Sequence, residues 1–223
     1  MHTKNYFSSS LEGHESLFDE RAYPWEALKR LQAYLESLEL GKIEIELPDS
    51  VHLVHPSLIS IAKGVVIEPN VFIQGPCIIG PKCVIRFGAY IRGNVILGKS
   101  CVVGHSTEVK HAIFFDSAKA AHFNYVGDSI LGADVNLGAG VKCANYRLDG
   151  ETISVSWDGK KINTGLKKFG AIVGDGAQIG CNSVTNPGTL VGKNAVILPC
   201  LNVGGTIAEG GMIKSTKETK CLL

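Results

Sequence analysis

The sequence has no long hydrophobic run and no strong charge of either sign. No apolar stretch approaches the ~20 residues that a membrane-spanning helix needs, and the opening "MHTKNYFSSSLEGHE" lacks the apolar core of a secretion signal. The formal net charge is +1, with lysine and arginine spread along the chain. We therefore expect a cytoplasmic protein with no membrane or nucleic acid partner.

Paired cysteine motifs are also missing. The chain has seven cysteines, an odd number, and none of them forms a CxxC pair. This usage argues against a zinc ribbon and against a disulfide framework. We expect most of the cysteines to be small buried apolar residues and no metal to be bound.

A period of six residues is the strongest positive signal. Aliphatic side chains occupy nine successive positions at this spacing: Ile61, Ile67, Ile73, Ile79, Ile85, Ile91, Leu97, Val103 and Val109. The period resumes at Val173, and small residues follow four positions after most of these aliphatics. Neither a helix nor an alternating strand has this spacing, whereas a parallel β-helix does. The sequence predicts an all-β fold in which three six-residue units close one triangular coil around an aliphatic bore.

The flanking segments predict the domain organisation. Residues 1–50 contain a predicted helix between Pro24 and Gly41, with leucines on one face, and a short strand in "KIEIELPD". We expect this segment to cap the stack, because a β-helix leaves its ends open. The β-helix itself is predicted over 51–210, with a hairpin insertion at about 147–167 around Asp158-Gly159 and a tail at 211–223.

The six-residue count fails between Ser117 and Gly140, and chemical groups gather inside that break and around it. Histidine titrates near neutrality, so His122 is a candidate base, and the Glu108 carboxylate could fix its tautomer. Arg92, Lys110 and Lys168 could hold a phosphate. Each residue also has a purely structural interpretation: Asn136 suits a left-handed corner, and single lysines are usually solvated.

The strings "TEVK", "AAHFNYVGD", "NLGAG" and "CANY" resemble the acetyltransferase domain of the bifunctional glucosamine-1-phosphate acetyltransferase / N-acetylglucosamine-1-phosphate uridyltransferase family. The resemblance covers about residues 60–205, and the hairpin resembles the archaeal members. It implies a left-handed parallel β-helix that forms a homotrimer with sites between adjacent subunits. It also implies acetyl transfer from acetyl-CoA to a sugar-phosphate amine, on the route to UDP-N-acetylglucosamine.

The resemblance also implies the site residues. His122 is the expected catalytic base and Glu108 its orienting carboxylate. The expected substrate contacts are Arg92, Lys110, Tyr125, Asn136 and Lys168. The expected contacts of the acetyl group and coenzyme are Ala139, Asn145, Tyr146, Cys181 and Pro199. Cys181 stands where the family usually has serine, and Pro199 where it has a smaller coenzyme contact.

The uridyltransferase half of that family has no counterpart, because no glycine-rich nucleotide-binding loop followed by arginine is found. We expect no uridyltransferase activity, so a separate nucleotidyltransferase is a candidate partner. Three other interpretations stay open. The chain could transfer an acyl group to another sugar or sugar nucleotide. It could be a zinc hydratase that uses His105, His111 and His122. It could also be a non-catalytic trimeric scaffold.

Overall fold

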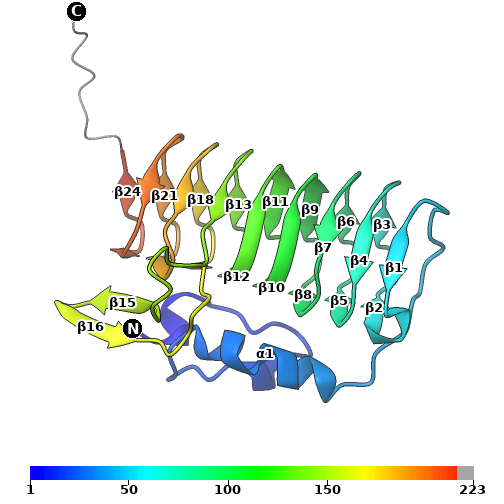
Figure 1. The fold of residues 1–223 in the computed structure, drawn as a ribbon, viewed down its shortest axis with the longest axis horizontal. Helices are drawn as coiled ribbons and strands as arrows, with labels where there is room; N and C mark the ends of the chain where they lie inside the picture. Colours follow the sequence, from blue (N-terminus) through cyan, green and yellow to red (C-terminus); the bar gives the residue numbers. More distant parts are fainter. Residues whose placement is uncertain (215–223) are drawn as a thin grey trace, which may run out of the picture.

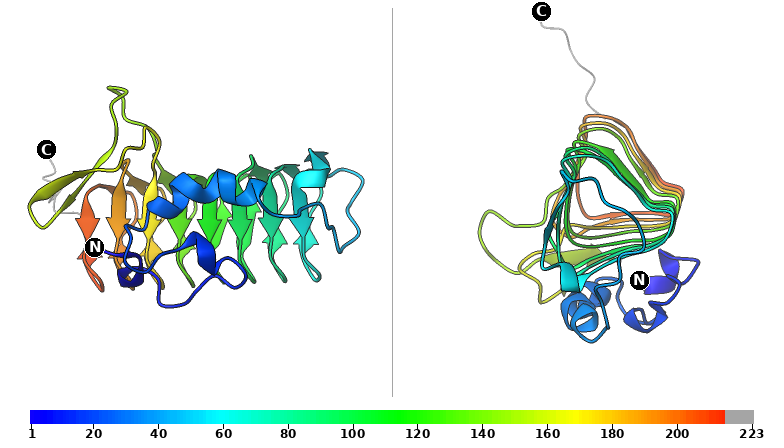
Figure 2. Two further views of the ribbon diagram at one scale, coloured as in Figure 1. Left: turned by 90° about the horizontal axis from the view of Figure 1, so that it is seen from below. Right: turned by 90° about the vertical axis from the view of Figure 1, so that its right-hand side faces the viewer.

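The chain folds into a left-handed parallel β-helix, and the computed structural model describes residues 1–214 of it. Viewed along its axis, the β-helix is a triangular prism, and each coil lies directly on the previous one (Figure 2). The strands of neighbouring coils pair in parallel on every face, as the hexapeptide period predicts.

The prism has three flat faces, which we number in the order in which the chain visits them. Face 1 contains β1 (His52–Val54), β4 (Phe72–Gln74), β7 (Tyr90–Ile91), the first halves of β10 (Glu108–Phe114) and β12 (Tyr125–Leu131), β14 (Lys142–Cys143), β19 (Val184–Thr185) and β22 (Asn202–Val203). Face 2 contains β2 (Ile59–Ile61), β5 (Cys77–Ile79), β8 (Val95–Leu97), the second halves of β10 and β12, β17 (Ala171–Val173), β20 (Thr189–Val191) and β23 (Thr206–Ile207). Face 3 contains β3 (Val66–Ile67), β6 (Val84–Ile85), β9 (Val102–His105), β11 (Lys119–His122), β13 (Asn136–Leu137), β18 (Gln178–Ile179), β21 (Val196–Ile197) and β24 (Met212–Ile213).

Aliphatic side chains fill the bore in register. On face 1, Ile73 pairs with Ile91, Ile91 with Val109 and Val109 with Val126, and all four are fully buried. Each fully buried aliphatic side chain contributes about 1.5–3 kcal/mol relative to an exposed one. The stacked bore therefore confirms the period of six as a core signal.

The count of six fails at one corner, between faces 1 and 2. From its bore residue on face 1 to that on face 2 one coil advances six residues, Ile91 to Leu97, whereas the next two coils advance only five, Val109 to Phe114 and Val126 to Leu131. The longer coil turns this corner with Gly93 and Asn94, both at positive φ. The next two coils use a single left-handed residue, His111 (φ 46°) and then Asp128 (φ 48°). Strands β10 and β12 therefore run across the corner without interruption.

The amino-terminal segment lies along face 2 rather than over the end of the prism. It contains the 3-10 turns η1 (Thr3–Asn5) and η2 (Glu15–Leu17) and the helix α1 (Glu26–Glu36), which lies lengthwise on the β-helix (Figures 1 and 2). One apolar cluster joins α1 to the outward side chains of face 2: Leu28, Leu31 and Leu35 with Ile96, Ile113 and Ile130. The expectation that the helix caps the stack is wrong, because face 2 carries an aliphatic stripe that must be covered.

Residues after the helix close the end of the bore. The partly buried Ile43, Ile45, Leu47, Val51 and Leu53 pack against the bore cluster, ahead of the 3-10 turn η3 (Pro56–Leu58). The strand predicted in "KIEIELPD" is reduced to one bridge, between Ile43 and Ile61. A terminal coil has a neighbour on one side only, and Pro48 has no N–H to donate, so no longer ladder forms. The helix is also shorter than predicted and leaves Leu38 outside it.

The predicted hairpin is present as β15 (Ser154–Trp157) and β16 (Lys160–Asn163), joined by Asp158 and Gly159 at positive φ. Its buried Ile153 and Val155 join the apolar cluster on face 2. In the described part of the chain no helix is both long and apolar enough to cross a membrane. Cysteines 77, 83, 101 and 143 are buried, whereas Cys181 and Cys200 are exposed. Cys221 and most of the predicted tail lie outside the described residues.

Two partly buried histidines hold the amino-terminal segment, His14 within the segment and His111 from the β-helix, and they predict a loss of stability in acid. His111 Nε2 donates to the Leu28 carbonyl of α1 (3.0 Å), and His14 Nδ1 contacts Tyr34 Oη (2.7 Å). Burial lowers the pKa of both side chains below the usual 6.5. The unfolded chain therefore takes up protons first as the pH falls through about 6.5, so the free energy of unfolding should decrease there.

Urea unfolding between about pH 7.5 and about pH 5.5 measures this effect. The variant His111→Asn keeps a side chain that tolerates positive φ but cannot be charged, so its stability should depend less steeply on pH. His52→Asn, at an exposed position, is the control and should follow the parent. A parent whose stability rises as the pH falls over this range would contradict the prediction.

Candidate active site at a corner of the β-helix

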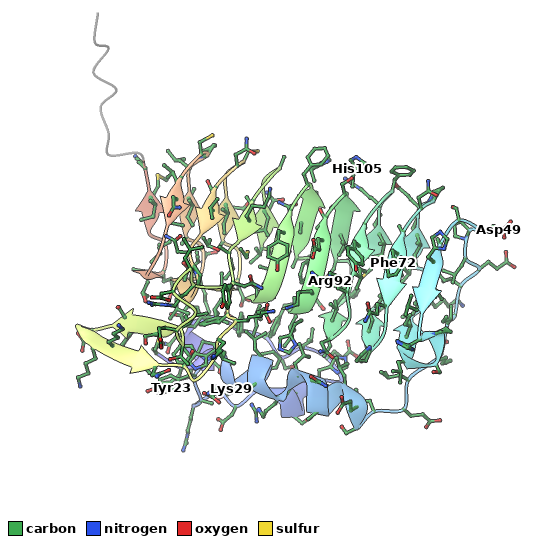
Figure 3. All side chains as sticks on the ribbon, in the orientation of Figure 1. Tyr23, Lys29, Asp49, Phe72, Arg92 and His105 are labelled. Atoms are coloured by element: carbon green, nitrogen blue, oxygen red, sulfur yellow. The ribbon has the colours of Figure 1, made fainter. Side chains whose placement is uncertain are left out.

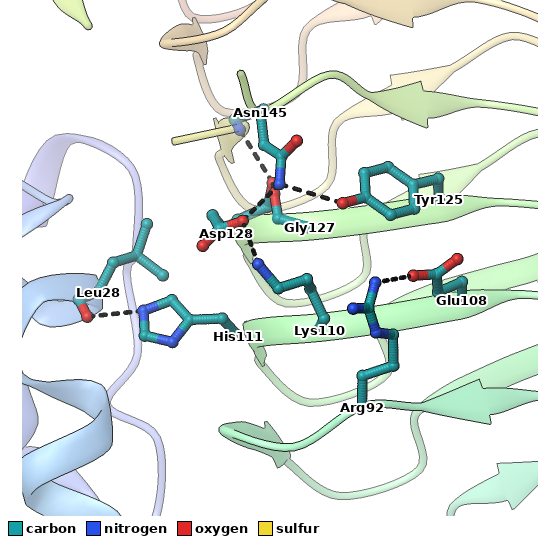
Figure 4. A network of polar contacts seen from close by, with 11 residues as sticks. Leu28, Arg92, Glu108, Lys110, His111, Tyr125, Gly127, Asp128 and Asn145 are labelled. Atoms are coloured by element: carbon teal, nitrogen blue, oxygen red, sulfur yellow. Dashed lines mark hydrogen bonds and ion pairs between the residues drawn. The ribbon is translucent and has the colours of Figure 1, made fainter. Parts of the chain in front are cut away.

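Six of the residues predicted for the site line one groove. It has a volume of about 520 Å³ and is formed by Arg92, Lys110, Tyr125, Asn145, Tyr146 and Lys168. It lies on face 1 beside the corner that the shortened coils turn, and Figure 4 shows its central contacts. The grouping confirms that these residues, scattered along the sequence, are neighbours in space.

Stacking of successive coils accounts for the first three. Tyr90 pairs with Glu108 and Glu108 with Tyr125, so Arg92, Lys110 and Tyr125 come from three consecutive rungs of face 1. The parallel register alone brings two cations and a phenol to one place, since each rung is separated from the next by about 4.8 Å.

The hairpin insertion supplies the remaining part of the groove. The chain leaves the coil after Asn145 and returns at Lys168, where Tyr146 and Lys168 form an antiparallel bridge. The Phe169 N–H donates to the Asn145 carbonyl (2.9 Å), and the Phe169 ring is buried 5.9 Å from the Trp25 ring. The insertion therefore returns Lys168 to the groove, although 21 residues separate it from Tyr146 in sequence.

Carboxylates hold two of the three cations. Arg92 donates to Glu108 (2.6 Å), which raises the pKa of Arg92, and Lys110 Nζ lies 3.1 Å from Asp128 Oδ2. Lys168 has no ion pair among residues 1–214. With Glu108 and Asp128 both ionised, three cations face two anions, so the groove has one positive charge in excess and favours an anionic ligand.

The Tyr125 hydroxyl is a hydrogen-bond donor in this setting. Burial, with smaller contributions from Asp128 and Glu108, raises the pKa of its hydroxyl above the usual value of 10.0. The phenol therefore keeps its hydrogen at neutral pH and can donate to a ligand oxygen.

His122 lies outside the groove, at the opposite corner of face 1. It ends β11 with its side chain exposed rather than in the bore, and it pairs in register with His105. Figure 3 shows His105 at the edge of the prism and Arg92 further along face 1. His122 is still close to Tyr125 along the chain, because their Cα atoms, three residues apart, are separated by at most about 11 Å.

A buried asparagine fixes the backbone at this corner. Asn124 Oδ1 accepts from the His122 N–H (3.0 Å), and its Nδ2 donates to the Gly138 carbonyl one coil further on (2.7 Å). Phe123, which lies between His122 and Asn124, has φ 52°, an unusual value for an aromatic residue. The asparagine side chain replaces ladder bonds that the turn cannot make, and it holds His122 at the surface.

Three of the predicted coenzyme contacts lie at the same corner as His122, on the coils that follow it. Gly140 N donates to the His122 carbonyl, Asn182 N to the Ala139 carbonyl and Cys200 N to the Cys181 carbonyl. Ala139, Cys181 and Pro199 therefore follow His122 along the axis of the prism. The other two predicted coenzyme contacts, Asn145 and Tyr146, line the groove instead.

Two predicted residues differ from expectation. Asn136 begins β13 on face 3, so within one chain it joins neither group. Glu108 was expected to orient His122, but its carboxylate pairs with Arg92, and no hydrogen bond joins it to the His122 ring in residues 1–214. The register explains the pairing, because the side chains of Arg92 and Glu108 leave face 1 on adjacent rungs.

Sequence reasoning missed two charged residues. Asp128 accepts hydrogen bonds from Lys110 and Asn145, and the break in the six-residue count at "VGD" is the signal that could have indicated it. Lys142 donates to the carbonyls of Phe123 (3.1 Å) and Gly140 (2.8 Å), next to His122. Nothing in the sequence separates this lysine from the other exposed ones.

The three histidines considered for zinc do not converge. His105 and His122 share one corner, whereas His111 turns the other corner and contacts α1. Among the described residues no three histidine, cysteine or acidic side chains form a group that could hold a metal ion.

Comparisons with known proteins identify the relatives. The family model of the GMPPB C-terminal domain matches residues 73–164. A bifunctional protein GlmU of Methanococcus maripaludis is 34% identical over 180 residues, which are 81% of this chain and 43% of the relative. The chain is therefore similar to the GlmU proteins over about four fifths of its length. A bifunctional sugar-1-phosphate nucleotidylyltransferase/acetyltransferase of Sulfurisphaera tokodaii is 38% identical over 111 residues, 50% of this chain and 28% of the relative.

This chain thus spans less than half the length of these two relatives. Among solved structures, a UDP-N-acetylglucosamine acyltransferase of Francisella novicida matches 78% of this chain and 67% of its own with a TM-score of 0.52 and 16% identity. That likeness supports the fold alone.

The groove predicts anion binding that depends on Lys168. Replacing Lys168 by alanine should weaken the binding of inorganic phosphate by about 5- to 10-fold, since one charge-assisted contact is lost. Lys161→Ala, on the exposed hairpin strand, is the matched control and should bind like the parent. Isothermal titration calorimetry at low ionic strength measures both, and equal dissociation constants for the two variants would contradict the assignment.

Proposed function

We propose that the protein is an acetyl-CoA-dependent N-acetyltransferase acting on an amino-sugar 1-phosphate such as glucosamine-1-phosphate. The observation that carries the proposal is the groove, in which Arg92, Lys110 and Lys168 gather with an excess of positive charge. Such a groove suits a phosphate monoester. The similarity to proteins named as GlmU and as a nucleotidylyltransferase/acetyltransferase supports the choice of reaction.

The acceptor lies along face 1 in this proposal. Its phosphate is bound by the cations of the groove, and its sugar ring extends past Tyr125 toward the His122 corner. The spacing is suitable, because the Cα atoms of Tyr125 and His122 are at most about 11 Å apart. Asn136 would join the acceptor site from an adjacent subunit of a homotrimer, since within one chain it lies on face 3.

The acyl donor follows the second corner. Ala139, Cys181 and Pro199 lie in line with His122 and would contact the pantetheine arm. The backbone there is accessible, because Gly138, Ala139 and Gly140 carry little or no side chain. Cys181 and Pro199 are both exposed and could accommodate an extended ligand. Asn145 and Tyr146 would meet the acetyl group from the groove side.

His122 is the general base of the reaction. It removes a proton from the amine as the nitrogen attacks the thioester carbonyl. The new amide C–N bond forms, the C–S bond breaks, and the proton on the imidazole passes to the departing thiolate, which leaves as coenzyme A thiol. Glu108, which already holds Arg92, adds negative charge on the same face and would stabilise the imidazolium.

The variant His122→Ala tests this role. General-base catalysis contributes about 10²–10⁴-fold, so kcat for acetylation of glucosamine-1-phosphate should fall by about that factor while the fold persists. A coupled assay of thiol release gives kcat, and circular dichroism checks the fold.

The control is His105→Ala, which alters the histidine one coil before His122 and should retain parental kcat. A His122→Ala enzyme with parental kcat would refute the base. A parent protein that binds no acetyl-CoA at millimolar concentration would instead favour the non-catalytic scaffold. Turnover with another amino sugar or nucleotide sugar, but not with glucosamine-1-phosphate, would change the acceptor and retain the reaction.

A further inference from the structure

Asp128 is a buried carboxylate beside the groove, and the proposed chemistry leaves it without a role. Its side chain is 8% exposed, and it turns the corner between faces 1 and 2. Its Oδ2 accepts from Lys110 Nζ at 3.1 Å and from Asn145 Nδ2, and its backbone carbonyl accepts from Gly170 N at 2.8 Å. A buried carboxylate is tolerated only when it is paired in this way.

The carboxylate decides which way the Asn145 amide faces. An ionised carboxylate can only accept hydrogen bonds, so Asn145 must turn its Nδ2 toward Asp128. The same nitrogen also donates to Tyr125 Oη at 3.1 Å (Figure 4). With Nδ2 engaged twice, Asn145 Oδ1 has no hydrogen-bond partner in the described part of the chain and is available to a ligand. Tyr125 Oη accepts one hydrogen bond and keeps its own hydrogen to donate.

We infer that Asp128 is a positioning residue that sets the hydrogen-bond polarity of the groove. It makes Asn145 present an acceptor and Tyr125 a donor, and it holds Lys110 beside them. Without this carboxylate both orientations of the Asn145 amide would be satisfied, because a tyrosine hydroxyl can donate or accept. The inference rests on the proposed function and adds to it. The groove prefers a substrate that carries an N–H group next to an oxygen, as an amino sugar does.

Gly127 makes the Asn145–Tyr125 contact possible. A Cβ atom at this position would lie 2.5 Å from Tyr125 Oη and 2.8 Å from Asn145 Nδ2. The backbone of Gly127 is not left-handed, so alanine tests the space between the two side chains rather than strain. Gly127→Ala should therefore separate Asn145 from Tyr125 and leave the Asp128 charge in place.

The charge of Asp128 has a second, opposite consequence. It lies next to the cations that bind an anion, so it weakens anion binding while it orients the amide. Replacing it by the neutral, isosteric asparagine should strengthen phosphate binding and impair turnover at the same time. A purely structural carboxylate would weaken both together when removed.

The experiment compares Asp128→Asn, Gly127→Ala and the control Glu26→Gln, which removes a surface ion pair with Lys29 on α1. Calorimetry gives the dissociation constant of inorganic phosphate, and the acetylation assay gives kcat and KM for glucosamine-1-phosphate. We expect Asp128→Asn to bind phosphate about 3- to 10-fold more tightly and to lose about 10-fold or more in kcat. Gly127→Ala should lose kcat without tighter phosphate binding, and Glu26→Gln should match the parent.

Several outcomes would overturn the inference. Weaker phosphate binding and a lower melting temperature in Asp128→Asn would show a structural role. Unchanged kcat in both groove variants would show that the amide polarity is not needed. If the parent does not acetylate glucosamine-1-phosphate, the proposed function fails, but the phosphate measurement still tests Asp128. The positioning role of Asp128 would then be rejected by two results together. Lys110 and Asn145 would be unmoved in a crystal structure of Asp128→Asn, and the phosphate affinity of that variant would be unchanged.

Discussion

Parallel stacking of coils is the constraint on which the structure depends. Every rung must bury an aliphatic side chain in the bore and must pair its backbone with the coils on either side. This leaves only outward side chains and corner residues free to vary. Chemistry on such a fold is confined to columns, because a residue at a given corner has its counterpart at the same corner one coil away. The groove and the His122 corner are two such columns, separated by the width of face 1.

The shortened corner shows how function is accommodated without breaking the stack. Replacing the two-residue turn at Gly93 and Asn94 by His111 and then Asp128 lets β10 and β12 cross from face 1 to face 2. The corner residues then serve both sides of the prism. His111 contacts the helix that covers face 2, and Asp128 contacts the groove on face 1. The amino-terminal segment, the hairpin and the groove are thus joined through a few residues.

Much of the architecture and part of the site could be predicted from the sequence. The period of six identified the bore, and the Asp158-Gly159 pair identified the hairpin turn. The resemblance named Arg92, Lys110, Tyr125 and Lys168 as substrate contacts and Asn145 and Tyr146 as coenzyme contacts, and these six residues line one groove. The position of α1 was not predictable, because an amphipathic helix shows only that it has an apolar face and not which surface it covers. The pairing of Glu108 with Arg92 was missed for a similar reason: two neighbouring coils decide it, not neighbours in sequence.

The sequence by itself determined the coil, since a residue every six positions can be buried only in a bore with three sides. It also determined which residue types were available for chemistry. Only the tertiary structure decided where they meet. Register across coils placed Arg92 on Glu108, the return of the hairpin placed Lys168 beside Tyr146, and the buried Asp128 turned the Asn145 amide. These contacts join residues of different coils, and the number of residues in each intervening coil sets their alignment, so they exist only once the prism has closed.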